Sequence, residues 1–151
     1  MPKKTKNVSY FEGVGRRRTS VAVVRLYIPG KDKTATIGET KIKTGEIYVN
    51  GKKVDAFFPS LHQKVQYLKP IKLAKAEDRF CISIKVHGGG IQGQLEAVVH
   101  GLARALEKTD SEVVRPVLKK ESLLTRDPRA RQRRKVGTGG KARRAKQSPK
   151  R

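Results

Sequence analysis

The sequence predicts an α+β fold, in which helices cover one face of a small mixed sheet, followed by a long, extended basic C-terminal tail. Three observations predict it. Residues 80–87 alternate between apolar and polar side chains, which is typical of a half-buried strand. Residues 95–106 repeat apolar side chains at helical spacing, which indicates an amphipathic helix. Residues 126–151 carry twelve Lys/Arg against one acid, so they cannot bury enough surface to fold alone.

The chain divides into three predicted parts. Residues 1–9 are polar and basic, and we expect a flexible N-terminus there. Residues 10–125 contain all of the predicted strands and helices, and a chain of this size buries enough surface for one modest core. Residues 126–151 form the extended basic tail. Arg predominates in it, and the planar guanidinium of Arg binds phosphate oxygens in a bidentate manner.

The first half of the domain predicts short strands separated by turns. Residues 21–28 are rich in Val and indicate the first strand, which Pro29-Gly30 ends. The polar residues 31–44 predict a hairpin or a loop. Residues 46–49 indicate a further short strand, and Asn50-Gly51 after it is a strong signal for a tight turn.

A helix is predicted over residues 56–68. Pro59 fits its first turn and Pro70 marks its end. Four apolar residues recur at spacings of four, four and three, and we expect them to face the core: Phe57, Leu61, Val65 and Leu68.

The second half of the domain predicts one strand and two helices. The strand over 80–87 has a core face and a solvent face; the core face comprises Phe80, Ile82, Ile84 and Val86, and the solvent face Cys81, Ser83, Lys85 and His87. The helix over 95–106 buries an apolar stripe made of Leu95, Val98, Val99, Leu102, Ala103 and Leu106. A last helix begins near Ser111, capped by Asp110 or Ser111, and ends near Leu124. Pro116 fits poorly inside it, so its start could instead lie nearer Arg115.

The charge of the whole chain indicates a polyanionic partner. The net charge is +23, and subtracting the tail's +11 leaves +12 on residues 1–125, so both parts are basic. A nucleic acid explains a positive domain and a positive tail together. Trp is absent and there are only eight Tyr and Phe, which disfavours a surface that stacks successive bases. We therefore expect contacts to phosphates and to the shape of folded RNA.

Composition also bears on the compartment. Cys81 is the single cysteine, so no intrachain disulfide can form and a reducing compartment fits. The basic start has no apolar core after it, unlike a secretory signal. No run approaches the ~20 apolar residues that cross a bilayer, and no amphipathic helix flanks the tail. We expect a soluble cytoplasmic protein that binds no membrane.

A glycine-rich segment opens the helix over 95–106. It has the spacing G-x-G-x-x-G, with glycines at Gly88, Gly89, Gly90 and Gly93, follows a strand, and has Asp110 about twenty residues later. A dinucleotide site is disfavoured, because Asp110 follows the helix and not a second parallel strand. Two interpretations stay open. The loop could present backbone N–H groups to an RNA phosphate, or the glycines could let strand and helix pack closely.

No enzyme is predicted, and no cofactor or metal. The histidines lie far apart without ligand spacing, no Walker-type Gly-Lys-Ser/Thr occurs, and Thr19 and Ser20 lack a base partner. Arg16-Arg17-Arg18 is a second basic cluster, placed before the strand at 21–28. It is either a positioned phosphate contact or an ordinary charged loop.

Several motifs resemble those of the small ribosomal subunit protein nine family, of the universal, bacterial or organellar type. They run in the family's order over nearly the whole chain: Gly13-Val14-Gly15-Arg16-Arg17-Arg18-Thr19-Ser20, Tyr48-Val49-Asn50-Gly51-Lys52, Val86-His87-Gly88-Gly89-Gly90-Ile91-Gln92-Gly93-Gln94, His100-Gly101-Leu102-Ala103-Arg104-Ala105-Leu106, Leu123-Leu124-Thr125-Arg126-Asp127-Pro128-Arg129 and the final Lys150-Arg151. Three departures are visible. Arg18 stands where the family usually has Lys, Gln92 where it has a small residue, and the Phe that commonly follows Gln147 is absent.

The resemblance implies a domain like the second domain of ribosomal protein five, placed in the head of the small subunit. It further implies a tail that passes through rRNA until its tip contacts the anticodon stem-loop of the peptidyl-site tRNA. By the resemblance, Arg151 and Lys150 contact tRNA. The residues assigned to rRNA, including the basic cluster, are Arg16, Arg17, Arg18, Arg126, Arg129, Arg131, Arg133, Arg134, Lys135, Arg143, Arg144 and Lys146. Neighbouring small-subunit head proteins are further expected partners.

Two other classes of function remain to be separated from this one. A free protein that compacts DNA or chaperones RNA would use the same charge without a fixed site. A dinucleotide-dependent enzyme would bind its cofactor at the glycine segment. The first alternative predicts that salt strips the protein from any particle, and the second predicts cofactor binding by the domain.

Overall fold

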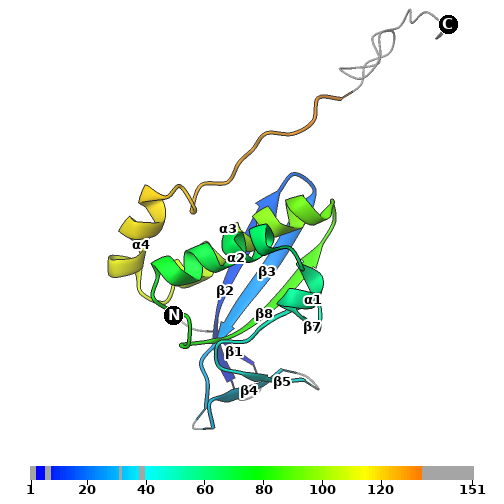
Figure 1. The fold of residues 1–151 in the computed structure, drawn as a ribbon. Helices are drawn as coiled ribbons and strands as arrows, with labels where there is room; N and C mark the ends of the chain where they lie inside the picture. The colour runs from blue at the N-terminus through cyan, green and yellow to red at the C-terminus, as the bar shows by residue number, and fades with distance from the viewer. Residues whose placement is uncertain (1–2, 6–7, 31, 38–39, 134–151) are drawn as a thin grey trace, which may run out of the picture.

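The computed structural model describes residues 3–5, 8–30, 32–37 and 40–133 of the 151-residue chain. In this part of the chain, six strands form one mixed sheet, and two more form a separate hairpin (Figure 1). Helices lie on one face of the six-stranded sheet. The α+β class and the mixed sheet predicted from the sequence are therefore confirmed.

The sheet has the strand order β1-β2-β3-β8-β6-β7. Its strands are Lys3–Thr5 (β1), Val8–Arg17 (β2), Ser20–Tyr27 (β3), Ile47–Val49 (β6), Lys52–Lys53 (β7) and Cys81–His87 (β8). β6 and β8 pair in parallel, and the other neighbours pair antiparallel. The strands predicted over 21–28, 46–49 and 80–87 are confirmed with ends shifted by a residue.

The sequence did not reveal β1 and β2. Residues 21–28 were predicted to form the first strand, and this is wrong, because two strands precede them. β2 was missed since Gly13 and Gly15 interrupt its apolar pattern, and glycine inside a strand usually weakens it. β1 lies within residues 1–9, where no strand was predicted, and pairs with Val8–Tyr10.

The glycines of β2 have a packing role. A Cβ on Gly15 would lie 1.9 Å from the Ala97 carbonyl oxygen, and one on Gly13 would lie 2.4 Å from that of Gly101. Helix α3 (Ile91–Glu107) therefore packs directly on the backbone of β2. Gly101 completes the contact, because a Cβ there would lie 2.8 Å from a methyl carbon of Val24. The close approach buries the predicted stripe of α3, except that Val99 is only half-buried.

Side chains from α3 and its C-cap also bond the edge of β2. Beyond the residues that pair with β1, this edge has no strand neighbour in the described part of the chain. Residues at successive turns take the place of a strand: the Arg16 N–H donates to His100 Nδ1 (3.3 Å), Arg104 Nη1 donates to the Val14 carbonyl (2.6 Å), and Lys108 Nζ donates to the Glu12 carbonyl (2.7 Å). Bonding an exposed edge in this way protects it from pairing with another chain.

The region predicted as one helix over 56–68 contains two. α1 (Val54–Phe57) ends before Pro59, and α2 (Leu61–Leu73) begins after it and continues through Pro70. The predicted buried face is wrong for Leu61 and Val65, which are 80% and 66% exposed. The side chains that α2 buries are instead Tyr67, Pro70 and Ile71. Neighbouring α3 fixes which face is covered, and the apolar spacing alone did not distinguish the two faces.

Residues 31–44 were predicted as a hairpin or a loop, and the described part of them forms the hairpin of β4 (Thr34–Ile37) and β5 (Thr40–Lys43). It forms a second small core with one end of the sheet, and this core includes Cys81. Cys81 was predicted to lie on the solvent face of its strand. That is wrong, because its side chain is 0% exposed under the hairpin. Burial raises the pKa of the Cys81 thiol, which disfavours the reactive thiolate.

The predicted turn and last helix are also present. Asn50 and Gly51 both have positive φ (49° and 82°), as a tight turn requires. α4 (Ser111–Lys120) has Asp110 as its N-cap, which accepts a bond from the Val113 N–H, and it contains Pro116. The alternative start near Arg115 is therefore wrong. The helix ends four residues earlier than predicted, just before Ser122 takes a positive φ of 55°.

The packing of α3 on β2 predicts a large penalty for a single methyl group. We expect Gly15→Ala to lower the free energy of unfolding by about 2 kcal/mol or more, because the backbone atoms of α3 cannot move aside cheaply. Gly30→Ala is the matched control, since a Cβ there meets only the Thr34 carbonyl oxygen at 3.8 Å. Denaturant unfolding of both variants measures the difference. Equal stability of the two would contradict the packing account.

Candidate nucleic-acid interface

The predicted basic cluster and the glycine segment lie side by side at one end of the domain. Arg16 and Arg17 end β2, and Arg18 and Thr19 make the turn into β3. β8 pairs with β3 so that Val21 lies opposite His87, which brings the glycines after β8 next to this turn. Ser20 Oγ donates to the Gly88 carbonyl at 3.0 Å.

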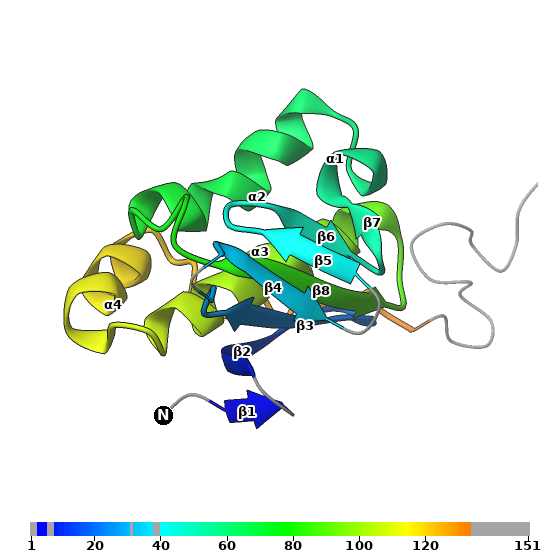
Figure 2. The ribbon, with the colours of Figure 1, turned by 90° about the horizontal axis from the view of Figure 1, so that it is seen from below.

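The first residues of the tail reach the same end of the domain. We use the name tail root for residues 124–129. At its start, His100 Nε2 lies 3.3 Å from the Leu124 carbonyl oxygen. Farther on, Asp127 and the Arg129 carbonyl contact Arg17. The chain thus crosses from α4 back over α3 towards the β2–β3 turn, as the orange segment shows (Figures 1 and 2).

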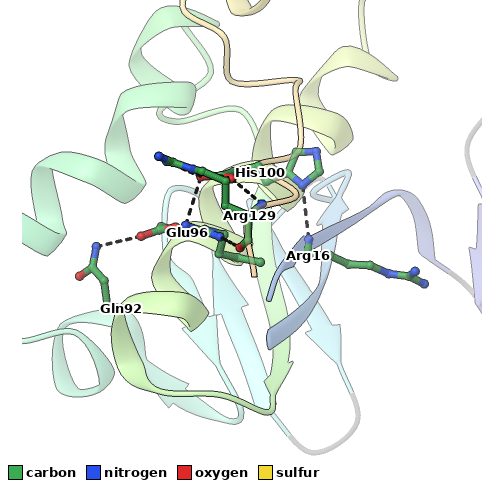
Figure 3. Close-up of polar contacts among 7 residues, drawn as sticks. Arg16, Gln92, Glu96, His100 and Arg129 are labelled. Carbon is green, nitrogen blue, oxygen red and sulfur yellow. Dashed lines mark hydrogen bonds and ion pairs between the residues drawn. The ribbon is translucent and has the colours of Figure 1, made fainter. Parts of the chain in front are cut away.

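Arg17 differs from its two neighbours. Its side chain is 10% exposed, and its guanidinium donates to Glu96 of α3 and to the Arg129 carbonyl (2.7 Å). It also forms an ion pair with Asp127 at 3.1 Å. Figure 3 shows Glu96 and His100 on α3, with Arg129 of the tail root beside them. The guanidinium of Arg17 therefore bonds to groups within the protein, whereas the neighbouring Arg16 and Arg18 are exposed.

Exposed arginines lie on the β2–β3 turn and along the described part of the tail that leaves this end of the domain (Figure 1). They come from the β2–β3 turn and from the described part of the tail, and they are Arg16, Arg18, Arg126, Arg129, Arg131 and Arg133. The other predicted contacts lie outside the described residues: Arg134, Lys135, Arg143, Arg144, Lys146, Lys150 and Arg151. The structure thus brings the arginines of the β2–β3 turn close to the start of the tail, so that both sequence clusters present guanidinium groups near this end of the domain.

Asp127 is the only acid of the tail, and its charge is used within the protein. Hydrogen bonds from the Arg129 side chain and from its N–H (2.9 Å) hold the pKa of Asp127 well below its usual range. The positive charges of Arg129 and Arg17 lower it further. The carboxylate therefore stays ionised and compensated, so it opposes an approaching phosphate only weakly.

The glycines of the segment 88–93 differ in their surroundings. Gly88 and Gly89 have positive φ (76° and 63°), and a Cβ on either would overlap with Thr19 or Ser20. A Cβ on Gly93 would also come close to Ser20, at 2.9 Å from its Oγ. For these three, close packing against the β2–β3 turn is sufficient explanation.

Gly90 is different, because a Cβ there would meet nothing within 4 Å. It is the N-cap of α3 and offers no side chain to the first N–H groups of the helix, and the first turn of α3 contains no acid. This open helix N-terminus carries a partial positive charge beside the arginines.

A hollow of about 290 Å³ lies beside the tail root. Residues of β2, α2, α3 and the tail root line it, among them Gln66, Gln92, Glu96, His100 and Asp127. Sequence reasoning missed the roles of Glu96 and Asp127. The signal for Asp127 was available, since a single acid within so basic a tail indicates a specific internal partner.

Two other classes of site find no support in the described residues. Within these ranges there is no group of three or more His, Cys, Asp or Glu that could hold a metal ion. The helices of the described chain are all too short or too polar to cross a membrane.

His100 connects the edge of β2 to the tail root through both of its ring nitrogens. The Arg16 N–H points at Nδ1, so this nitrogen keeps its lone pair while Nε2 carries the proton that faces the Leu124 carbonyl. Burial lowers the pKa of His100, and the positive charges of Arg104 and Arg126 lower it further, against the opposing effect of the Leu124 bond. Protonation of Nδ1 would also place a second donor against the Arg16 N–H, so the hydrogen bond between them would be lost.

A pH dependence of stability follows from this shift. Since the folded-state pKa lies below the ordinary 6.5, the unfolded chain binds the proton more readily. The contribution of His100 is therefore complete above that value and is lost as pH falls through the folded-state pKa. We expect the free energy of unfolding to fall more between about pH 7.5 and about pH 5 in the natural protein than in His100→Gln. Parallel pH profiles would rule out this role.

A family model and a curated relative each match most of the chain. Residues 15–151 match the family described as ribosomal protein S9/S16. The chain is 44% identical over 149 residues to the small ribosomal subunit protein uS9 of Gloeothece citriformis (strain PCC 7424), which covers 98% of this chain and 97% of that protein. The chain therefore belongs to the ribosomal protein S9/S16 family, and as a member it is a structural, non-enzymatic component of the ribosome in the cytoplasm.

Proposed function

We propose that the protein is a structural constituent of the head of the small ribosomal subunit, where it binds small-subunit rRNA and its C-terminal residues contact the anticodon stem-loop of the peptidyl-site tRNA. One observation carries the rRNA part. Arginines that lie far apart in the sequence are exposed together at the end of the domain where the tail leaves it. The relative's name, small ribosomal subunit protein, supports the same particle.

The chemistry of this surface suits phosphate more than base edges. A guanidinium binds two phosphate oxygens in one plane, and each neutralised phosphate releases condensed counterions. The open N-terminus of α3 at Gly90 adds backbone N–H groups that favour an anion. Gly88, Gly89 and Gly93 support this loop by packing on the β2–β3 turn. Phosphates of folded rRNA are the ligand that uses all of these groups.

The tRNA contact is assigned to Lys150 and Arg151, by the family resemblance. The described tail root supports it indirectly, because it leads the chain away from the domain with Arg131 and Arg133 exposed. Residues 134–151 would continue along rRNA and bring the last two cations to the tRNA backbone.

A second kind of partner fits another surface. Leu61 and Val65 of α2 are exposed next to Lys64, and they line a shallow groove. RNA gains little from covering apolar side chains, whereas a protein neighbour gains their burial. We assign this face of α2 to a neighbouring small-subunit head protein.

The alternative of a free DNA-compacting or RNA-chaperoning protein is less well supported. Such a polycation needs no fixed arrangement of its charges, yet Arg17 is used to hold the tail root against α3. A dinucleotide-dependent enzyme is disfavoured because Thr19 and Ser20 occupy the space next to Gly88 and Gly89.

The position of the charges can be tested through the salt dependence of rRNA binding. Four exposed arginines outside the Asp127 contacts are replaced together by Gln: Arg16, Arg18, Arg131 and Arg133. If each contacts one phosphate, the slope of log affinity against log salt should become shallower by about 3, at ~0.7 for each contact. Filter binding to the isolated rRNA head domain measures the slope.

The matched control removes the same charge elsewhere. It replaces four exposed lysines on β7, α2 and α4 by Gln: Lys52, Lys72, Lys119 and Lys120. We expect its slope to stay close to that of the natural protein. Equal slopes for the two variants would mean that binding depends on the total charge and not on where the charges lie. That result would support the free polycation instead.

The tRNA contact requires its own experiment. We expect deletion of Lys150 and Arg151 to leave incorporation into small subunits unchanged and to speed dissociation of peptidyl-site tRNA about tenfold, as loss of ~1.4 kcal/mol implies. Replacing Lys3 and Lys4 by Gln removes the same charge at the other end of the chain and serves as the control. Unchanged tRNA dissociation from the truncated subunits would disprove the contact while leaving rRNA binding untouched.

A further inference from the structure

We propose that Arg17 is a positioning residue that fixes the tail root on the folded domain before any RNA is bound. The sequence assigned Arg17 to rRNA together with Arg16 and Arg18. The contacts of Arg17 instead join the domain to the tail: Glu96 belongs to the domain, and Asp127 and Arg129 belong to the tail root. The inference does not depend on which nucleic acid the rest of the tail binds.

The arrangement uses the particular shape of Arg. The guanidinium presents several N–H donors in one rigid plane. Here Nε faces Glu96, Nη1 donates to the Arg129 carbonyl at 2.7 Å, and Nη2 lies 3.1 Å from Asp127. Three donor nitrogens thus meet three acceptors, one on α3 and two on the tail root. A Lys has a single nitrogen and cannot occupy all three positions with the same geometry.

Burial separates this cluster from ordinary surface ion pairs. Exposed pairs often contribute nothing measurable, because water screens them and two long side chains must be ordered. The Arg17 side chain at the centre of the cluster is only 10% exposed, and those of its partners Asp127 and Glu96 are 30% and 41% exposed. The base of the Arg17 side chain lies on β2, which α3 holds by direct backbone contact at Gly15. The cation is therefore held in place before the tail root meets it.

A second contact makes the path of the tail root definite. The His100 ring lies against the Leu124 carbonyl, a few residues before the Arg17 contacts. With one contact alone the tail root could rotate about that point, whereas two contacts fix the direction in which it runs. Within the root, Asp127 also accepts from the Arg129 N–H at 2.9 Å, and Pro128 between them has a restricted φ.

Fixing the root has a physical benefit for any ligand of the tail. A chain segment that is already oriented loses less conformational entropy when the following residues bind. It also confines those residues to a smaller volume and so raises their effective concentration at an adjacent site. Arg17 would thereby assist binding without contacting the ligand itself.

The test measures the position of the tail in the free, full-length protein. Spin labels are placed on Ala130→Cys, just after the root, and on Lys72→Cys of α2, and the distribution of the distance between them is recorded by pulsed electron resonance. Cys81 is buried and stays unlabelled in the folded protein. Two variants break the cluster from opposite sides: Asp127→Asn from the tail and Arg17→Lys from the domain. Glu77→Gln is the charge-matched control, since Glu77 is exposed on the loop before β8.

We expect one narrow distribution in the natural protein and in Glu77→Gln. Asp127→Asn and Arg17→Lys should each broaden it roughly two-fold, because each weakens the contacts that hold the tail root to the domain and a less constrained segment samples more orientations. Asp127→Asn should do so without lowering the midpoint of thermal unfolding, which separates positioning from a general effect on the fold. A broad distribution in the natural protein, or an unchanged one in Asp127→Asn, would overturn the proposal.

Discussion

The contact between α3 and β2 determines where the other parts of the molecule lie. Gly13 and Gly15 on the strand and Gly101 on the helix let the two backbones approach without side chains between them. This closeness puts His100 within reach of the β2 edge, and it places Glu96 next to Arg17. The tail root can then lie across α3 and still contact β2. A thicker interface would separate these partners, and the tail would have no specific surface to follow.

The basic residues of the domain divide into two groups with different uses. Arg17, Arg104 and Lys108 bond to acids or carbonyl groups within the protein, so their contacts hold the fold together. The arginines on the β2–β3 turn and the described tail remain exposed, and they share one end of the domain. The high net charge alone therefore overstates the surface available to a polyanion. It is the position of each cation, and not the total, that defines the interface.

The sequence predicted the elements whose pattern is local and regular. β8 and α3 have clear period-two and helical repeats, and Asn50-Gly51 marked its turn. β2 was not predicted, because its glycines pack against a helix that lies more than eighty residues away in the sequence. The exposed face of α2 was misassigned, since Leu61 and Val65 have helical spacing but are not covered by any of the described residues. Cys81 is buried by a hairpin that period-two alternation does not include.

The candidate site was predicted as a set of residues but not as an arrangement. Charge density identified the arginines, whereas the internal role of Arg17 depends on Glu96 and Asp127, which lie far from it in the sequence. A structure of the assembled small subunit tests the whole account most directly. It should show rRNA phosphates within hydrogen-bond distance of Arg16 and Arg18, with Arg17 still bound to Glu96 and Asp127. RNA in direct contact with Arg17, or only on the side of α2 and α4, would contradict it.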